Sequence, residues 1–325
     1  MAVTVLGLVL IVGGASFTFL VVATIVLGAG TGILGPSRVI VLANVFPDLK
    51  ASAVSISQAS GTLGNAVLPI IAGIVMGYLG WRGGLGLLLP FCVVVGIGLW
   101  RLVPDRPATT STTSVTETGS RSARALSGKA AVLGTMMMLG VMITFQSLTG
   151  FLPTYLTDVT GLSPSEATVL FGVFFGAGLV MQLLAGVVAD LLTPQRTVGI
   201  FAIITLPAVV LILGAETGWG LTAGVILASG LLGCFPPGLT YLVSVFPASV
   251  QGPGFGVIRT IYIGGGSLGP IGVGLVADWL TLWMAFFLLI VVLACLCFIA
   301  GVLPALKDNT SGGEVPPSDD PPSSD

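Results

Sequence analysis

Long apolar stretches restrict what this chain can fold into more than any other feature of the sequence. There are ten of them, and they cover approximately residues 2–15, 17–43, 52–79, 83–103, 129–156, 165–191, 197–215, 219–246, 252–279 and 282–303. A helix needs about 20 apolar residues to cross a bilayer core, so only the first stretch is clearly short. Because the stretches lack the alternation of barrel strands, the sequence predicts membrane-spanning helices.

The residue types support this fold class and exclude several functions. Only 7% of the 325 residues are charged, whereas 54% are hydrophobic. A soluble domain carries about a quarter charged residues. The chain has no histidine, the commonest metal ligand and general base. No zinc spacing, P-loop, basic tract or paired carboxylates within a span are present, so we expect no metal, no cofactor, no nucleic acid partner and no enzymatic activity.

Two polar segments divide the chain. Residues 104–127 are rich in Ser and Thr, which is typical of a flexible linker. Residues 304–325 are rich in Pro, Ser and Asp, and we expect them to form a disordered acidic tail. The sequence therefore predicts a helical bundle of four spans over residues 1–103 and a bundle of six spans over residues 128–303.

The distribution of Lys and Arg predicts the orientation in the membrane. With the N-terminus in the cytoplasm, only Arg82 among the Lys and Arg residues outside the spans faces outward. Eight basic residues then face the cytoplasm: Lys50, Arg101, Arg106, Arg121, Arg124, Lys129, Arg196 and Lys307. This asymmetry follows the positive-inside rule. We therefore expect a multi-pass protein of the plasma membrane with both termini in the cytoplasm.

The tripeptide Val-Phe-Pro occurs twice, at residues 45–47 and 245–247, each time where one span ends and the next begins. At the same offset, Pro36 aligns with Pro236. After one inserted residue, Pro69 aligns with Pro270. An even number of spans separates the copies, so both have the same orientation. Parallel repeats of this kind relate the halves of some secondary transporters.

Several motifs resemble those of the major facilitator superfamily. They are "LGAGTG" with "GPSRVIVLANVFP", "LGWR", "FLPTYLTDVTGLSPSEA" and "GVVADLLTPQR". The last resembles the family's signature loop: Gly186 and Asp190 match it, and Arg196 falls one place late. The resemblance covers residues 1 to 303. It implies two six-helix halves, of which the first would lack its first two spans here, and alternating access around a midplane site.

Arg38 and Arg259 lie inside predicted spans, where a charged group is costly and is by default a functional hypothesis. The alternative is that each side chain reaches the inner headgroups. Gln58 is the repeat partner of Arg259. No Asp or Glu lies near the centre of a span, which favours an anionic or zwitterionic substrate over a cation.

The family resemblance adds further candidates, because its fourth, seventh and tenth spans line the central cavity. The complete substrate-binding set is Arg38, Gln58, Gln146, Tyr241 and Arg259. Interhelical hydrogen bonding without transport is the alternative for the polar members, as it is for Asn65, Gln182 and Tyr262. The resemblance also assigns helix packing and bending to Gly64, Pro69, Gly73, Gly265, Pro270 and Gly274.

These observations predict a monomeric secondary active transporter of a small solute, with a coupling ion as a second possible ligand. Two other interpretations stay open at this point: a transport-inactive fragment of a longer gene product, and a helical membrane scaffold that only binds partners. Uptake into liposomes distinguishes both from a transporter.

Overall fold

Every element of the described residues is a helix in the computed structural model of the chain, which confirms the predicted all-α class. The structure describes residues 2–14, 16–102, 127–215, 218–247 and 251–311. The predicted linker, apart from Ser127, and the end of the predicted tail lie outside these ranges. Within them, eight helices are long and apolar enough to cross a membrane, and the helix Ala2–Gly13 is apolar but shorter.

The N half precedes the linker, and two of the eight candidate spans, Phe17–Val45 and Gly77–Gly98, lie in it. Its helices are α1 (Ala2–Gly13), α2 (Phe17–Val45), α3 (Lys50–Gly86) and α4 (Leu88–Leu102). Helix α3 is interrupted at Gly80, whose φ of 69° suits a residue without a Cβ. The predicted boundary between the spans 52–79 and 83–103 falls at this break. Immediately after it, Arg82 donates a hydrogen bond to the Gly14 carbonyl oxygen at 2.6 Å, which ties the turn to the end of α1.

The C half follows the linker. Its helices are α6 (Lys129–Asp158), α7 (Pro164–Leu191), α8 (Pro194–Gly214), α9 (Trp219–Ala228), α10 (Gly230–Gly233), α11 (Phe235–Val245), α12 (Gln251–Gly266), α13 (Leu268–Trp279) and α14 (Leu282–Ser311). Two predicted spans are divided: 219–246 into α9, α10 and α11, and 252–279 into α12 and α13. Pro236 and Pro237 begin α11, where the missing N–H groups break the hydrogen-bond ladder. Helix α14 continues past the predicted end at residue 303, as far as Ser311.

Short sequence signals set several helix ends. Ser163 and Glu166 form a reciprocal capping box at the start of α7. Thr193 caps α8, with Pro194 in the first helical position. Both Val-Phe-Pro copies end a helix: α2 stops at Val45, and α11 stops at Val245. The two copies therefore occupy equivalent places in the two halves, as the repeat predicts.

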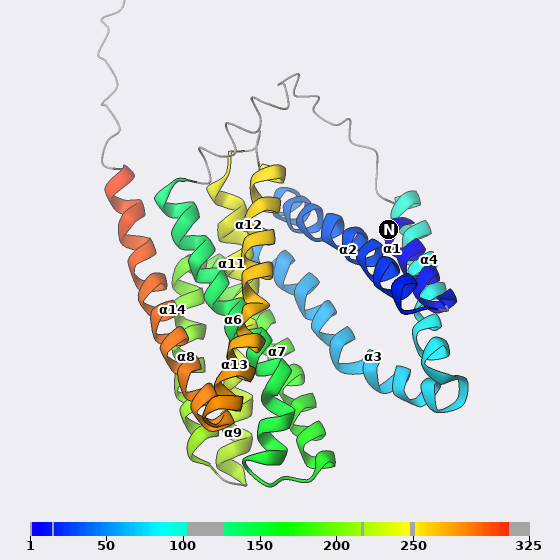
Figure 1. The fold of residues 1–325 in the computed structure, drawn as a ribbon. Helices are drawn as coiled ribbons and strands as arrows, with labels where there is room; N and C mark the ends of the chain where they lie inside the picture. The colour runs from blue at the N-terminus through cyan, green and yellow to red at the C-terminus, as the bar shows by residue number, and fades with distance from the viewer. Residues whose placement is uncertain (1, 15, 103–126, 216–217, 248–250, 312–325) are drawn as a thin grey trace, which may run out of the picture.

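The helices of the C half stand together as one bundle, and α2 and α3 diverge from it toward α1 and α4 (Figure 1). The two halves meet where α3 packs along α7 and against α11, and where α2 contacts α11 and α12. We call the end at which α4 stops and α6 starts the linker end; it is at the top of Figure 1. The opposite end is called the far end.

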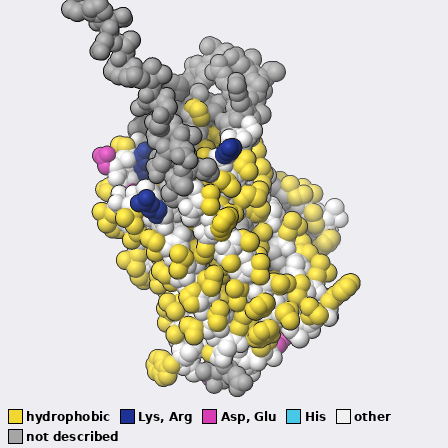
Figure 2. Space-filling view, turned by 90° about the vertical axis from the view of Figure 1, so that its left-hand side faces the viewer, with side chains coloured by type: hydrophobic (Ala, Val, Ile, Leu, Met, Phe, Trp, Pro, Cys, Tyr) yellow, Lys and Arg dark blue, Asp and Glu magenta, His cyan; other side chains and the backbone are white. Residues whose placement is uncertain are grey.

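The outer surface is apolar, as a bilayer requires. Figure 2 shows a face covered mostly by hydrophobic side chains, with the visible Lys and Arg side chains near the linker end. On the N half, Phe91 and Trp100 are 65% and 84% exposed. Such side chains would be unfavourable in water and are stable against lipid. The chain is therefore an integral membrane protein with a helical two-bundle fold.

Candidate functional site

A cavity of about 260 Å³ lies between the two halves. Helix α3 forms its wall on the N half, and α6, α7, α10, α11 and α12 form its wall on the C half. The lining side chains from the C half are Met142, Phe145, Phe175, Gln182, Leu232, Phe235, Leu239, Arg259, Tyr262 and Ile263. A concave site between two bundles is where ligands of helical membrane proteins are expected to bind.

The α3 wall is a stripe of polar and small residues. Gln58, Gly61, Thr62 and Asn65 all line the cavity. Their spacing of three, four and seven residues places them on one face of the helix. This stripe faces the other half, and its Asn65 side chain, which has no hydrogen-bond partner among the described residues, is available to a solute.

Two arginines meet at one edge of the cavity. Arg38 of α2 donates a hydrogen bond to the Gln58 side-chain oxygen at 2.5 Å. Arg259 of α12 lines the cavity and reaches across to α2: a Cβ atom on Gly35 would lie 2.6 Å from its Nη2 atom. The Arg259 Nη1 atom also lies 3.5 Å from the Tyr262 hydroxyl oxygen. The structure thus brings Arg38, Gln58 and Arg259 together, although they are distant in sequence.

No described residue balances the positive charge at this edge of the cavity. The positive charges of Arg38 and Arg259 are close enough to interact with each other. Among the described residues, neither guanidinium group forms an ion pair, and no Asp or Glu lines the cavity. Two like charges in a region of low dielectric repel each other unless an anion lies between them. The site is therefore suited to an anionic group.

A second set of contacts joins the halves, from the cavity toward the linker end. The buried hydroxyl of Thr62 donates to the Gln182 side-chain oxygen at 2.8 Å. One turn further along α7, Gly186 packs so closely against α3 that an added Cβ would clash with the Ser55 Oγ atom. After one more turn, Asp190 accepts hydrogen bonds from the first backbone N–H groups of α3.

Asp190 caps α3 across the interface between the halves. Its two carboxylate oxygens accept from the backbone N–H groups of Ala51 and Ser52, each at 2.9 Å. A negative charge at a helix N-terminus satisfies unpaired N–H groups and complements the helix dipole. Arg196, the third residue predicted for this loop, has an exposed side chain in the first turn of α8, and its backbone N–H donates to Thr193 of the same turn. Gly186 and Asp190 of α7 thus both contact the first turns of α3 in the other half.

Three predicted substrate-binding residues do not line the cavity: Arg38, which bonds to the lining residue Gln58, and the pair Gln146 and Tyr241. The Gln146 amide nitrogen donates to the Ile263 carbonyl oxygen at 3.3 Å, which joins α6 to α12. The Tyr241 hydroxyl donates to the Ala130 carbonyl oxygen at 3.1 Å and joins α11 to α6. In this structure both contacts join helices within the C half, which was the alternative considered for them.

The residues predicted to allow helix packing and bending differ in how closely other helices pack against them. Positions 265, 270 and 274 all face α6 within the C half. An added Cβ at Gly265 would lie 2.6 Å from Leu139, and one at Gly274 would lie 3.6 Å from Phe151; Pro270 lies beside Gly150. Gly64 has only Leu68 of its own helix within reach. Pro69 and Gly73 belong to α3, but their surroundings fall outside the described residues.

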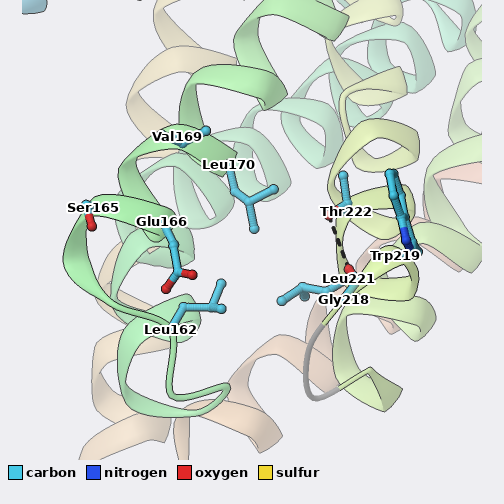
Figure 3. Close-up of a pocket in the computed structure, with 9 residues that line it drawn as sticks. All are labelled: Leu162, Ser165, Glu166, Val169, Leu170, Gly218, Trp219, Leu221 and Thr222. Carbon is cyan, nitrogen blue, oxygen red and sulfur yellow. Dashed lines mark hydrogen bonds between the residues drawn. The ribbon is translucent and has the colours of Figure 1, made fainter.

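A larger hollow of about 460 Å³ lies at the far end, between the starts of α7 and α9 (Figure 3). Its walls are mostly apolar, and its one charged group, Glu166, is engaged by the Ser163 N–H and hydroxyl groups. The Thr222 hydroxyl donates to the Gly218 carbonyl oxygen. Because this hollow lies within the C half and its polar groups are already paired, the cavity between the halves is the better candidate.

Three cavity residues were considered at the sequence level but not assigned to the site: Asn65, Gln182 and Tyr262. Thr62 was missed altogether. The spacing of Thr62 and Asn65 from Gln58 carried the signal, since it places all three on one face of a helix. No group of His, Cys, Asp or Glu side chains among the described residues could hold a metal ion.

Comparisons with known proteins agree with this architecture. The sequence pattern of the Major Facilitator Superfamily matches residues 1–163 and, in a second match, residues 135–323. A single-residue variant of the E. coli fucose:proton symporter FucP superposes with a TM-score of 0.74 at 13% identity, over 93% of this chain and 82% of that one. The human organic anion transporter MFSD10 (TETRAN) superposes with a TM-score of 0.74 at 14% identity, over 92% of this chain and 75% of that one. At these identities the structures show a shared fold, and the sequence pattern shows the family. The chain therefore belongs to the Major Facilitator Superfamily of membrane transporters.

Proposed function

We propose that this chain is a secondary transporter that carries a small anionic or zwitterionic solute by alternating access. The observation that carries the proposal is the cavity between the halves, with the unbalanced charges of Arg38 and Arg259 at its edge. Arg38 is exposed and Arg259 half-buried, and within a membrane-spanning helix a charge without a counter-charge among the described residues is stabilised by an oppositely charged ligand. Arg38, Gln58 and Arg259 would hold the solute, and Gln146 and Tyr241 would pack the C half.

The contacts between α3 and α7 support the alternating-access part of the proposal. Asp190 and Gly186 close the linker end, and we assign this end to the cytoplasm on the Lys and Arg distribution of the sequence. The described conformation would then be closed toward the cytoplasm. Release of the solute there requires the Asp190 contacts to break and the halves to rotate about the cavity.

Uptake into liposomes tests the proposal. The purified chain is reconstituted, and protein-dependent uptake is measured for labelled lactate, succinate, phosphate and benzenesulfonate, with glucose and choline as neutral and cationic comparisons. We expect uptake of at least one anion that Arg259→Gln abolishes. Arg259→Lys should restore it only partly, because a point charge does not reproduce the planar guanidinium fork.

Arg101→Gln serves as the matched control, since it removes an exposed positive charge at the end of α4, away from the cavity. Uptake of choline alone, or parental anion uptake in Arg259→Gln, would contradict the assignment of an anion. Absence of uptake for every solute would favour the helical scaffold.

A further inference from the structure

The two walls of the cavity differ in chemical character. The α3 wall carries only polar and small residues: Gln58, Gly61, Thr62 and Asn65. On the C half, the lining side chains from α6, α10 and α11 are all apolar, among them Phe145 and Phe235, whereas α7 and α12 contribute the polar groups of Gln182, Arg259 and Tyr262. A solute that fills this space must therefore be polar along one side and apolar along the other.

The aromatic side of the cavity is already well packed. Phe145 and Phe235 meet edge to face, with centroids 5.2 Å apart and planes at 85°. Phe175 packs against Phe174 in a similar way, with centroids 5.3 Å apart. These rings offer dispersion contacts and no hydrogen bonds. A small hydrated ion, or a sugar with hydroxyls on every side, would lose hydrogen bonds to water against this wall without replacing them.

The polar side offers hydrogen-bond donors and one cation. The Asn65 side chain has no hydrogen-bond partner among the described residues, and the Gln182 oxygen is used by Thr62 while its amide nitrogen has no such partner. Arg259 supplies the positive charge. Because no described carboxylate lines the cavity, the ammonium group of a zwitterion would find no counter-charge there. This favours an anion over a zwitterion.

The volume limits the size of the solute. A cavity of roughly 150 Å³ accommodates one benzene molecule, so about 260 Å³ leaves room for one ring and a carboxylate. A second fused ring would require a side chain of the wall to move.

We propose that the solute of this site is a monocarboxylate with a single ring-sized apolar body. Its carboxylate lies toward Arg259 and the amides of the α3 side, and its body lies against Phe145 and Phe235. The inference rests on the proposed function and narrows it from small anions or zwitterions to amphipathic organic anions.

Isothermal titration calorimetry on the purified full chain tests the inference with six probes. Benzoate is compared with benzamide, phenylalanine, acetate, inorganic phosphate and 2-naphthoate. We expect benzoate to bind at least tenfold more tightly than each of the others. Benzamide lacks the charge, phenylalanine adds an ammonium group, acetate and phosphate lack the ring, and 2-naphthoate exceeds the volume.

Two variants test which residues contact the carboxylate and which contact the ring of the solute. Arg259→Gln should remove the preference for benzoate over benzamide. Phe145→Ala should admit 2-naphthoate, because truncation of a wall residue enlarges the cavity. Phe151→Ala is the control on the same helix: Phe151 is half-buried and lies outside the cavity, so 2-naphthoate should stay excluded.

The outcomes separate this inference from the proposed function. Binding of acetate or phosphate as tight as that of benzoate, or tighter binding of phenylalanine, overturns the inference. Arg259-dependent uptake of another anion by a protein that does not bind benzoate also overturns it, while leaving the proposed function intact. If no anion binds and no anion is taken up, both fail.

Discussion

Asp190→Asn should open the linker end of the molecule. The carboxylate accepts one backbone N–H on each oxygen, at 2.9 Å in both cases. An asparagine keeps a single acceptor oxygen and turns an amide N–H toward the second donor. Hydrogen bonds to charged groups contribute about 1.5–3 kcal/mol each, and a charge at a helix N-terminus contributes about 0.3–1 kcal/mol. Because Asp190 is only half-buried, we expect Asp190→Asn to destabilise the conformation closed at the linker end by about 2 kcal/mol. This corresponds to a roughly 30-fold shift in the ratio of open to closed molecules.

Paired spin labels at the linker end measure this shift. Asp48→Cys in the N half and Ser244→Cys in the C half place labels at exposed positions. The background requires substitution of the four native cysteines, Cys92, Cys234, Cys295 and Cys297. Asp190→Asn should add a population with a longer distance between the labels.

Glu166→Gln is the matched control, because Glu166 lies on the same helix but bonds only within its own capping box. It should leave the distance distribution unchanged. Identical distributions for Asp190→Asn and its parent would refute the reasoning that this carboxylate holds the halves together.

Other contacts make three further outcomes testable. Gly186→Ala should lower stability by about 1–3 kcal/mol through overpacking against α3, whereas Gly172→Ala on the same helix, where an added Cβ meets nothing within 4 Å, should not; thermal unfolding measures both. Tyr241→Phe should cost about 1 kcal/mol and leave solute affinity unchanged, so a clear loss of affinity would place Tyr241 in the site after all. Single cysteines at Ser114 and Ser318 should resist an impermeant maleimide applied to intact cells, and labelling of either from outside would contradict the predicted orientation.

The fold could be predicted from sequence because its determinants are local. Runs of about 20 apolar residues fix the spans, and "LGWR" marks the turn that the structure forms at Gly80. Val-Phe-Pro marks two equivalent helix ends because proline disfavours helical backbone in the residue before it. The divisions at α10 and between α12 and α13 were not predicted, although Pro236 and Pro237 in the first turn of α11 carried a signal for the first of them.

The candidate site was only partly predictable, because it depends on which faces of distant helices meet. Arg38 and Arg259 stood out as charges within spans, and the structure places them together. Gln146 and Tyr241 were selected by the span on which they lie, and that criterion does not specify which way a side chain points. Thr62 looked like an ordinary polar residue until its contact with Gln182, 120 positions away, was known.

The cap that Asp190 places on α3 has a consequence for how variation would be distributed in this protein. Its partners on α3 are backbone N–H groups, which every residue except proline supplies. A mutational scan should therefore find that few substitutions are tolerated at position 190. At positions 51 and 52, the contact excludes only proline. This contact between the halves would thus restrict the residue type strongly on α7 and hardly at all on α3. Methods that infer contacts from correlated substitutions would overlook this contact. The side chains at positions 51 and 52 take no part in it, so they have no reason to vary together with position 190.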